Sequence, residues 1–128
     1  MIMKKVLIID DEEDLTFFVK ANLELAGDYE VNIANSGKEG LKIAARYKPD
    51  LILLDIMMPH MDGFEVLERL KNTPKTTSIP VIMLTAKGDE DSKVKSATLY
   101  NECYIVKPVQ IEFLKAKIEE VLERTHKI

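Results

Sequence analysis

Four runs of consecutive apolar residues, each of strand length, recur along the chain: residues 6–9, 51–54, 81–84 and 103–106. Continuous apolarity is typical of strands that are covered on both faces, as in a parallel sheet. A fifth segment, residues 29–34, alternates apolar and polar positions instead. This alternation predicts a half-exposed strand at the edge of the sheet.

Helical spacing of apolar residues fills the intervals between these strands. We expect one helix over 13–26, with Phe18 among the apolar residues that face the core and Gly27 at its end. A second helix is expected from Ser36 to about residue 47. A third helix is expected to begin at Asp62, and a fourth covers about 109–124. Residues 89–99 predict a weaker helix, because they hold few large apolar side chains.

Strand and helix therefore alternate five times, which predicts an α/β fold with a parallel sheet and helices on both of its faces. The length of 128 residues predicts a single domain over 1–128. Right-handed crossovers leave few possible topologies. In such sheets the functional site lies beyond the carboxyl ends of the strands.

The composition narrows the class of protein. The net charge of −4 argues against a strongly basic nucleic-acid binder, and the single cysteine allows no internal disulfide. The longest apolar runs have four residues, far fewer than the roughly 20 that a membrane-spanning helix needs. Since no targeting signal is recognisable, we expect a cytoplasmic protein without membrane contact.

Polar side chains follow four of the predicted strands: Asp10 and Asp11, then Asp55, Thr85 and Lys107. Taken alone, each has an ordinary interpretation as a helix cap, a turn residue or a strand end. Their positions at four strand ends on one side of the sheet favour a common site. Close carboxylates repel one another unless a cation lies among them, and an all-oxygen ligand set favours Mg²⁺.

Such a site could accept a phosphoryl group, because a free carboxylate beside Mg²⁺ can attack phosphorus and form an acyl phosphate. A flavin-binding protein would instead need a loop rich in Gly, Ser or Thr after the first strand, and here that loop is acidic. A phosphatase of the haloacid dehalogenase type would need Asp-x-Asp, which adjacent Asp10 and Asp11 do not provide.

Over essentially its whole length the chain resembles the receiver domain of two-component response regulators, close to the stand-alone chemotaxis type. The resemblance is carried by the motifs Ile8-Ile9-Asp10-Asp11-Glu12, Asp50 to Pro59, Met61-Asp62-Gly63, Leu84-Thr85-Ala86 and Tyr104-Ile105-Val106-Lys107-Pro108. It implies a flavodoxin-like, doubly wound (βα)5 fold with the strand order 2-1-3-4-5.

The resemblance also implies a role for individual residues. Asp55 would accept the phosphoryl group, while Asp10, Asp11, Asp55 and the backbone carbonyl of Met57 would hold Mg²⁺. Thr85 and Lys107 would bind the phosphoryl oxygens, and Tyr104 would move with Thr85 as a conformational switch. The peptide bond between Lys107 and Pro108 would be cis.

The implied donor is a phosphohistidine on a sensor histidine kinase or a histidine phosphotransfer protein. The chain would catalyse only its own phosphorylation and dephosphorylation, and it would act as a monomer or as a phosphorylation-dependent dimer without binding nucleic acid directly. Two alternatives stay open: a receiver-like interaction module that takes no phosphate, and the N-terminal fragment of a DNA-binding response regulator. Residues 100–103 depart from the family pattern, which together with the weak helix at 89–99 predicts a more mobile region.

Overall fold

The structure, a computed structural model, describes residues 3–86 and 103–125. Its strands are β1 (Lys4–Ile9), β2 (Tyr29–Ala34), β3 (Leu51–Asp55), β4 (Val81–Thr85) and β5 (Cys103–Val106). Its helices are α1 (Glu13–Leu25), α2 (Gly37–Tyr47), α3 (Gly63–Lys71) and α5 (Ile111–Thr125). The predicted helix at 89–99, the departures at 100–102 and the mobility expected there lie outside the described residues.

All strand pairs are parallel, and the strands lie side by side in the order β2-β1-β3-β4-β5. The predicted α/β class and strand order are therefore confirmed, as is the edge position of residues 29–34. The prediction that residues 103–106 are covered on both faces is wrong, since only Ile105 is fully buried. The reason is that β5 lies at the other edge of the sheet and pairs only with β4.

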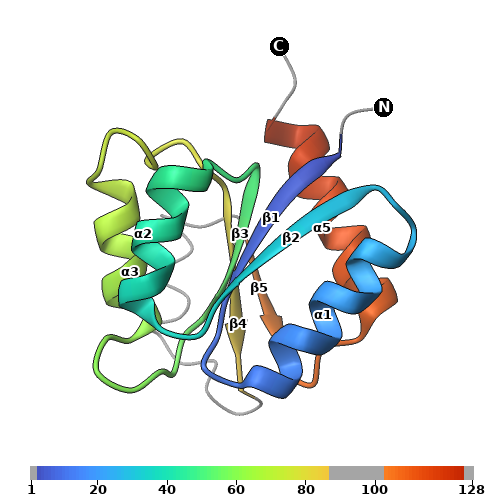
Figure 1. Cartoon of the computed structure of the whole chain (residues 1–128), viewed down its shortest axis with the longest axis horizontal. Helices are drawn as coiled ribbons and strands as arrows, with labels where there is room; N and C mark the ends of the chain where they lie inside the picture. The colour runs from blue at the N-terminus through green and yellow to red at the C-terminus, as the bar shows by residue number, and fades with distance from the viewer. Residues whose placement is uncertain (1–2, 87–102, 126–128) are drawn as a thin grey trace.

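Helices cover both faces of the sheet, with α1 and α5 on one side and α2 and α3 on the other (Figure 1). Side chains alternate across a strand, so β1 sends Leu7 and Ile9 into the core beneath α2 and α3. Val6 and Ile8 enter the core beneath α1 and α5. Every residue of β3 is buried, because this central strand contributes to both cores.

The predicted starts of two helices are confirmed by their capping bonds. Ser36 Oγ accepts a hydrogen bond from the Glu39 backbone N–H at 3.2 Å, and Asp62 Oδ1 accepts one from Glu65 at 2.9 Å. These bonds satisfy amide groups that the first turn of a helix leaves without partners. The last helix begins at Ile111, two residues later than expected.

One residue of α1, Phe18, is more exposed than the sequence pattern predicts. The buried residues of α1 are Thr16, Val19 and Leu23, whereas Phe18 is 44% exposed. Phe18 is the residue before Val19, so it lies about 100° around the helix and reaches the edge of the buried stripe. Gly27 has φ = +82° and follows the end of α1, as predicted for a glycine beyond a helix terminus.

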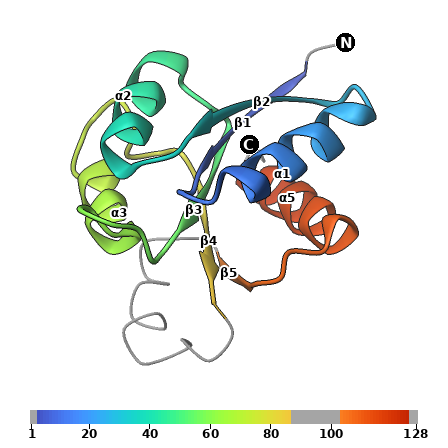
Figure 2. The same cartoon turned by 60° about the horizontal axis from the view of Figure 1, so that its bottom comes forward.

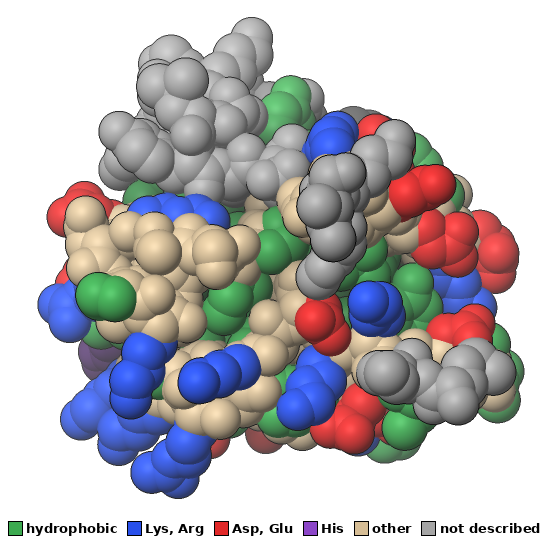
Figure 3. Space-filling view, turned by 90° about the horizontal axis from the view of Figure 1, so that it is seen from above, with side chains coloured by type: hydrophobic (Ala, Val, Ile, Leu, Met, Phe, Trp, Pro, Cys, Tyr) green, Lys and Arg blue, Asp and Glu red, His purple; other side chains and the backbone are tan. Residues whose placement is uncertain are grey.

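The carboxyl ends of the strands all point to one end of the molecule, which comes forward in Figure 2. Lys38, Lys42 and Arg46 on α2 are exposed, as is Lys48 directly after the helix. Basic side chains gather on one side of the molecule when it is seen from the end at which the strands begin (Figure 3). Among the described residues, no helix has the length and apolarity that crossing a membrane requires.

Candidate phosphoacceptor site

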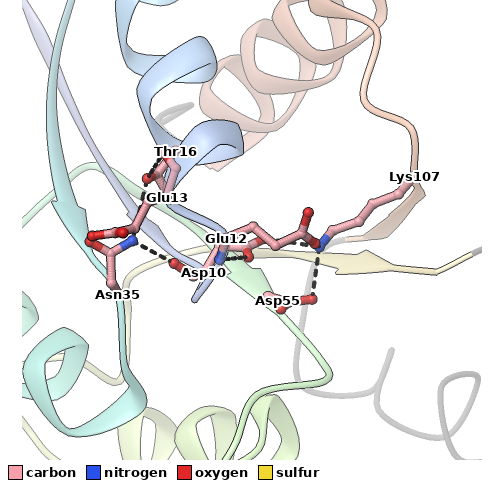
Figure 4. Close-up of polar contacts among 7 residues, drawn as sticks. All are labelled: Asp10, Glu12, Glu13, Thr16, Asn35, Asp55 and Lys107. Atoms are coloured by element: carbon pink, nitrogen blue, oxygen red, sulfur yellow. Dashed lines mark hydrogen bonds and ion pairs between the residues drawn. The ribbon is translucent and has the colours of Figure 1, made fainter.

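The ends of four strands place predicted site residues at one edge of the sheet, and Figure 4 shows three of them, Asp10, Asp55 and Lys107, in contact. Asp10 follows β1, Asp55 is the last residue of β3, Thr85 ends β4 and Lys107 follows β5. The sheet register continues beyond the strands: the Ile56 N–H donates to Leu84 O at 3.0 Å, and the Lys107 N–H donates to Thr85 O at 2.7 Å. Neighbouring strands therefore hold these four positions at the same level.

Asp10 is fixed by hydrogen bonds on three sides. Its backbone N–H donates to Ala34 O at 3.0 Å, and its carbonyl oxygen accepts from the Asn35 side-chain amide at 2.8 Å. Its carboxylate Oδ1 accepts from the Glu12 backbone N–H at 2.9 Å. The carboxylate of Asp10 is fully buried and does not cap α1, whose N-cap residue is Glu12.

Lys107 lies at the centre of the site. Its Nζ is 3.0 Å from Asp10 Oδ2, 2.7 Å from Glu12 Oε1 and 3.3 Å from Asp55 Oδ1. Burial by itself would lower the pKa of Lys107, but the three carboxylates outweigh burial and raise that pKa, so the ammonium stays charged. The backbone that carries Lys107 enters a cis peptide bond with Pro108, as the resemblance implies.

Asp55 is buried, with only 3% of its surface exposed. Burial, followed by repulsion from Asp10, raises the pKa of Asp55 to about 7, although Lys107 acts in the opposite direction. Burial likewise raises the pKa of Asp10. The positive charge near these two carboxylates is thus too small to compensate their negative charges fully when both are ionised.

A metal ion would supply that charge. Carboxylate oxygens of Asp10, Asp11 and Asp55 lie within 4.8 Å of one another, and Asp11 is exposed while the other two are buried. The buried Asp10 Oδ2 accepts no hydrogen bond of regular geometry from the described residues, and its contact with Lys107 is an ion pair. An all-oxygen set in which two buried carboxylates share one ammonium fits a hard divalent cation such as Mg²⁺.

The remaining predicted residues surround this cluster. Thr85 is 1% exposed, and its hydroxyl donates at 3.4 Å to the Ala86 carbonyl. Met57 follows β3 by two residues, and its side chain is 65% exposed, so its only contribution to a metal site would come from the backbone. Tyr104 lies on β5 and packs against the core beneath α2 and α3. The roles of Met57, Thr85 and Tyr104 stay predictions, as do those of the residues in the cluster.

Two residues of the site have no role assigned from the sequence motifs. Asn35 follows β2 and donates to the Asp10 carbonyl and, at 3.3 Å, to the Thr16 hydroxyl, thereby joining β2, the end of β1 and α1. Glu12 forms the shortest contact with Lys107. Asn35 directly follows a strand, just as Asp10 does, so its position was a usable signal, whereas Glu12 is one of five consecutive acidic residues.

The sequence profile of the response regulator receiver domain matches residues 6–119. The DNA-binding dual master transcriptional regulator RpaA of Synechocystis is 40% identical over 98% of this chain and 52% of its own length. The phosphate regulon transcriptional regulatory protein PhoB of Pseudomonas aeruginosa is 42% identical over 98% of this chain and 54% of its own length. The chain thus spans about half the length of these two curated relatives.

A solved structure extends the similarity to three dimensions. The chemotaxis protein CheY4 of Vibrio cholerae superposes with a TM-score of 0.86 at 30% identity, over 94% of this chain and 99% of that one. The profile match, the sequence relatives and the shared fold agree with the site described above. The chain belongs to the family of response regulator receiver domains.

Proposed function

We propose that this receiver domain takes a phosphoryl group from a phosphohistidine onto Asp55 and thereby switches a signalling state. The observation that carries the proposal is the position of Asp55, a buried carboxylate at the carboxyl edge of the sheet, with Lys107 Nζ at 3.3 Å and two further aspartates beside it. A nucleophile, a cation and a metal-binding set of carboxylates together suit phosphoryl transfer.

The chain's own residues would divide this work. Asp10, Asp11, Asp55 and the backbone carbonyl of Met57 would hold Mg²⁺, which supplies positive charge to phosphoryl oxygens when it is bound. The Lys107 ammonium would pair with one phosphoryl oxygen, and the Thr85 hydroxyl would donate a hydrogen bond to another. These groups neutralise and orient the transferred group, which is where most of the catalysis of phosphoryl transfer lies.

In the transfer, an Asp55 carboxylate oxygen forms a bond to phosphorus as the bond from phosphorus to the histidine nitrogen breaks. The nitrogen leaves with the electron pair, and Asp55 becomes an acyl phosphate. Water later attacks phosphorus and restores the carboxylate with release of inorganic phosphate. We propose that the chain catalyses these two reactions on itself and acts on no other substrate.

The donor would be a sensor histidine kinase or a histidine phosphotransfer protein, and we propose a cytoplasmic location because phosphohistidine is made from ATP. The phosphoryl group would shift an existing equilibrium between two conformations through Thr85 and Tyr104. Control of transcription is a second candidate output, which the identity to RpaA and PhoB favours. That output requires a longer protein that includes a DNA-binding segment.

The test is incubation with acetyl phosphate and Mg²⁺, followed by intact mass measurement. We expect the unmodified protein to gain the mass of one phosphoryl group, and the Asp55→Asn variant to gain none, because an amide is not a nucleophile toward phosphorus. A phosphoryl group that still appears on Asp55→Asn would overturn the assignment. No gain in either protein would favour the interaction module that takes no phosphate.

A further inference from the structure

Glu12 holds an unusual position at the start of α1. It is the N-cap residue of the helix, yet its side chain forms no capping hydrogen bond. Instead its Oε1 lies 2.7 Å from Lys107 Nζ, while its backbone N–H donates to Asp10 Oδ1 at 2.9 Å. Glu12 therefore contacts both the lysine and the buried aspartate of the site.

The three carboxylates around Lys107 differ in both distance and exposure. An ammonium has three N–H donors, and Lys107 Nζ has three carboxylates within reach before any phosphoryl group is present. The closest carboxylate, that of Glu12, has 60% of its side chain exposed, whereas Asp10 has 0% and Asp55 has 5%. A phosphoryl oxygen can bind Lys107 only when one of these contacts is released.

Of the two carboxylates that do not take up the phosphoryl group, Asp10 and Glu12, Glu12 is the one whose contact with Lys107 costs less to release. If Lys107 left Asp10, a buried carboxylate would lose its ion pair, which is strongly destabilising. If Lys107 left Glu12, water would solvate the exposed carboxylate. We propose that Glu12 is a positioning residue that holds Lys107 in the unphosphorylated state and competes with the phosphoryl group for it.

This inference rests on the proposed function and has a definite sign. Removing the Glu12 charge weakens a contact that exists only in the unphosphorylated state, and it also removes a negative charge near the entering phosphoryl group. Both effects favour the phosphoryl-bound state. We expect Glu12→Gln to increase the affinity for a phosphoryl mimic about two- to fivefold, the range set by a half-exposed ion pair.

The equilibrium test is a titration with beryllofluoride, a tetrahedral phosphoryl mimic, at saturating Mg²⁺. Glu13→Gln is the matched control: it removes the same charge one residue further on, where the exposed Glu13 forms no ion pair with the described residues. We expect Glu12→Gln to bind more tightly than the unmodified protein and Glu13→Gln to match it. Equal shifts in both variants, no shift, or weaker binding by Glu12→Gln would overturn the proposal.

A second readout needs neither metal nor phosphoryl mimic. In metal-free protein, NMR detects the Lys107 ammonium protons, whose exchange with water is slowed by their contacts. We expect faster exchange in Glu12→Gln and unchanged exchange in Glu13→Gln, and unchanged exchange in both would contradict the proposed hold on Lys107. The proposed function has its own control, since beryllofluoride binding to Asp55→Asn as tight as to the unmodified protein would refute Asp55 as the acceptor and leave the exchange result standing.

Discussion

At the scale of single residues, the site holds more buried negative charge than positive charge. Asp10 and Asp55 are almost fully buried, and Lys107 is the cation among the described residues that faces both of them. One ammonium shared among three carboxylates cannot neutralise them all, so burial and mutual repulsion raise the pKa values of Asp10 and Asp55. This imbalance favours binding of a cation.

This imbalance predicts a pH-dependent stability. In the folded, metal-free protein the pKa of Asp55 is raised to about 7 from 3.8, so its contribution to stability is complete below pH 3.8 and is lost as the pH rises through about 7. Asp55→Asn stays neutral throughout. We expect the free energy of unfolding of Asp55→Asn, relative to the unmodified protein, to increase by about 4 kcal/mol between pH 4 and pH 8.

Chemical denaturation in EDTA at several pH values checks this expectation. The internal control is Mg²⁺, which we expect to stabilise the unmodified protein at pH 8 more than Asp55→Asn, because the cation neutralises the carboxylate that the variant lacks. A stability difference that stays constant from pH 4 to pH 8 would show that Asp55 does not titrate as described.

At the scale of helices and strands, close packing fixes where Asp55 lies. Gly63 begins α3, and its backbone N–H donates to Ile56 O at 2.7 Å, immediately after β3. A Cβ atom at Gly63 would lie 2.7 Å from Ile56 Cα and would also collide with the Asp55 carbonyl oxygen. The start of α3 thus rests directly on the backbone of the proposed phosphoacceptor, and only glycine leaves room for it.

We therefore expect Gly63→Ala to lower the free energy of unfolding by about 1–3 kcal/mol, because backbone atoms must move to admit the methyl group. Gly40→Ala on α2 is the matched control, since its new Cβ would meet side-chain atoms of Ile9 rather than backbone. The higher helix propensity of alanine, worth roughly 1 kcal/mol, also offsets the cost in the interior of α2. Urea denaturation of both variants measures the difference, and an equal or larger loss in Gly40→Ala would contradict this account.

At the scale of the whole molecule, two cores share one sheet. Leu7, Ile52 and Leu54 face α2 and α3, while Ile8, Leu51 and Leu53 face α1 and α5. The central strands therefore couple both layers of helices. Charge is distributed unevenly around this framework: residues 10–14 are all acidic and lead from β1 into α1 at the site, whereas the exposed side of α2 carries Lys38, Lys42 and Arg46.

The shared sheet predicts a large cost for a cavity in its central strand. Leu53 is fully buried in β3, so Leu53→Ala should lower the free energy of unfolding by about 2–5 kcal/mol. Leu25→Ala is the same chemical change at a position that is 84% exposed, and we expect its effect to stay within about 0.5 kcal/mol. Thermal or urea denaturation measures both, and comparable losses in the two variants would contradict the burial of Leu53.

The sequence alone determined the fold class, the strand positions and most site residues. Continuous apolar runs are typical of buried strands, and parallel strands place their carboxyl ends at one edge, so the sequence itself predicts that Asp10, Asp55, Thr85 and Lys107 lie together. The capping residues Ser36 and Asp62 can also be recognised in the sequence, because an N-cap hydrogen bond is made within four residues. The apolar run at 103–106 gave no sign that β5 is partly exposed, because its edge position follows from the strand order and not from its own residues.

The connections within the site depend on how distant parts of the chain pack together. The contact between Glu12 and Lys107 joins residues 95 positions apart in the chain, and the Asn35 amide reaches the Asp10 carbonyl across 25 positions. No local pattern specifies such pairs, because each depends on how two strand ends and a helix terminus are placed in space. Residue types and spacing therefore identified the groups of the candidate site, whereas packing determined which carboxylate lies closest to Lys107 and how deeply Asp55 is buried.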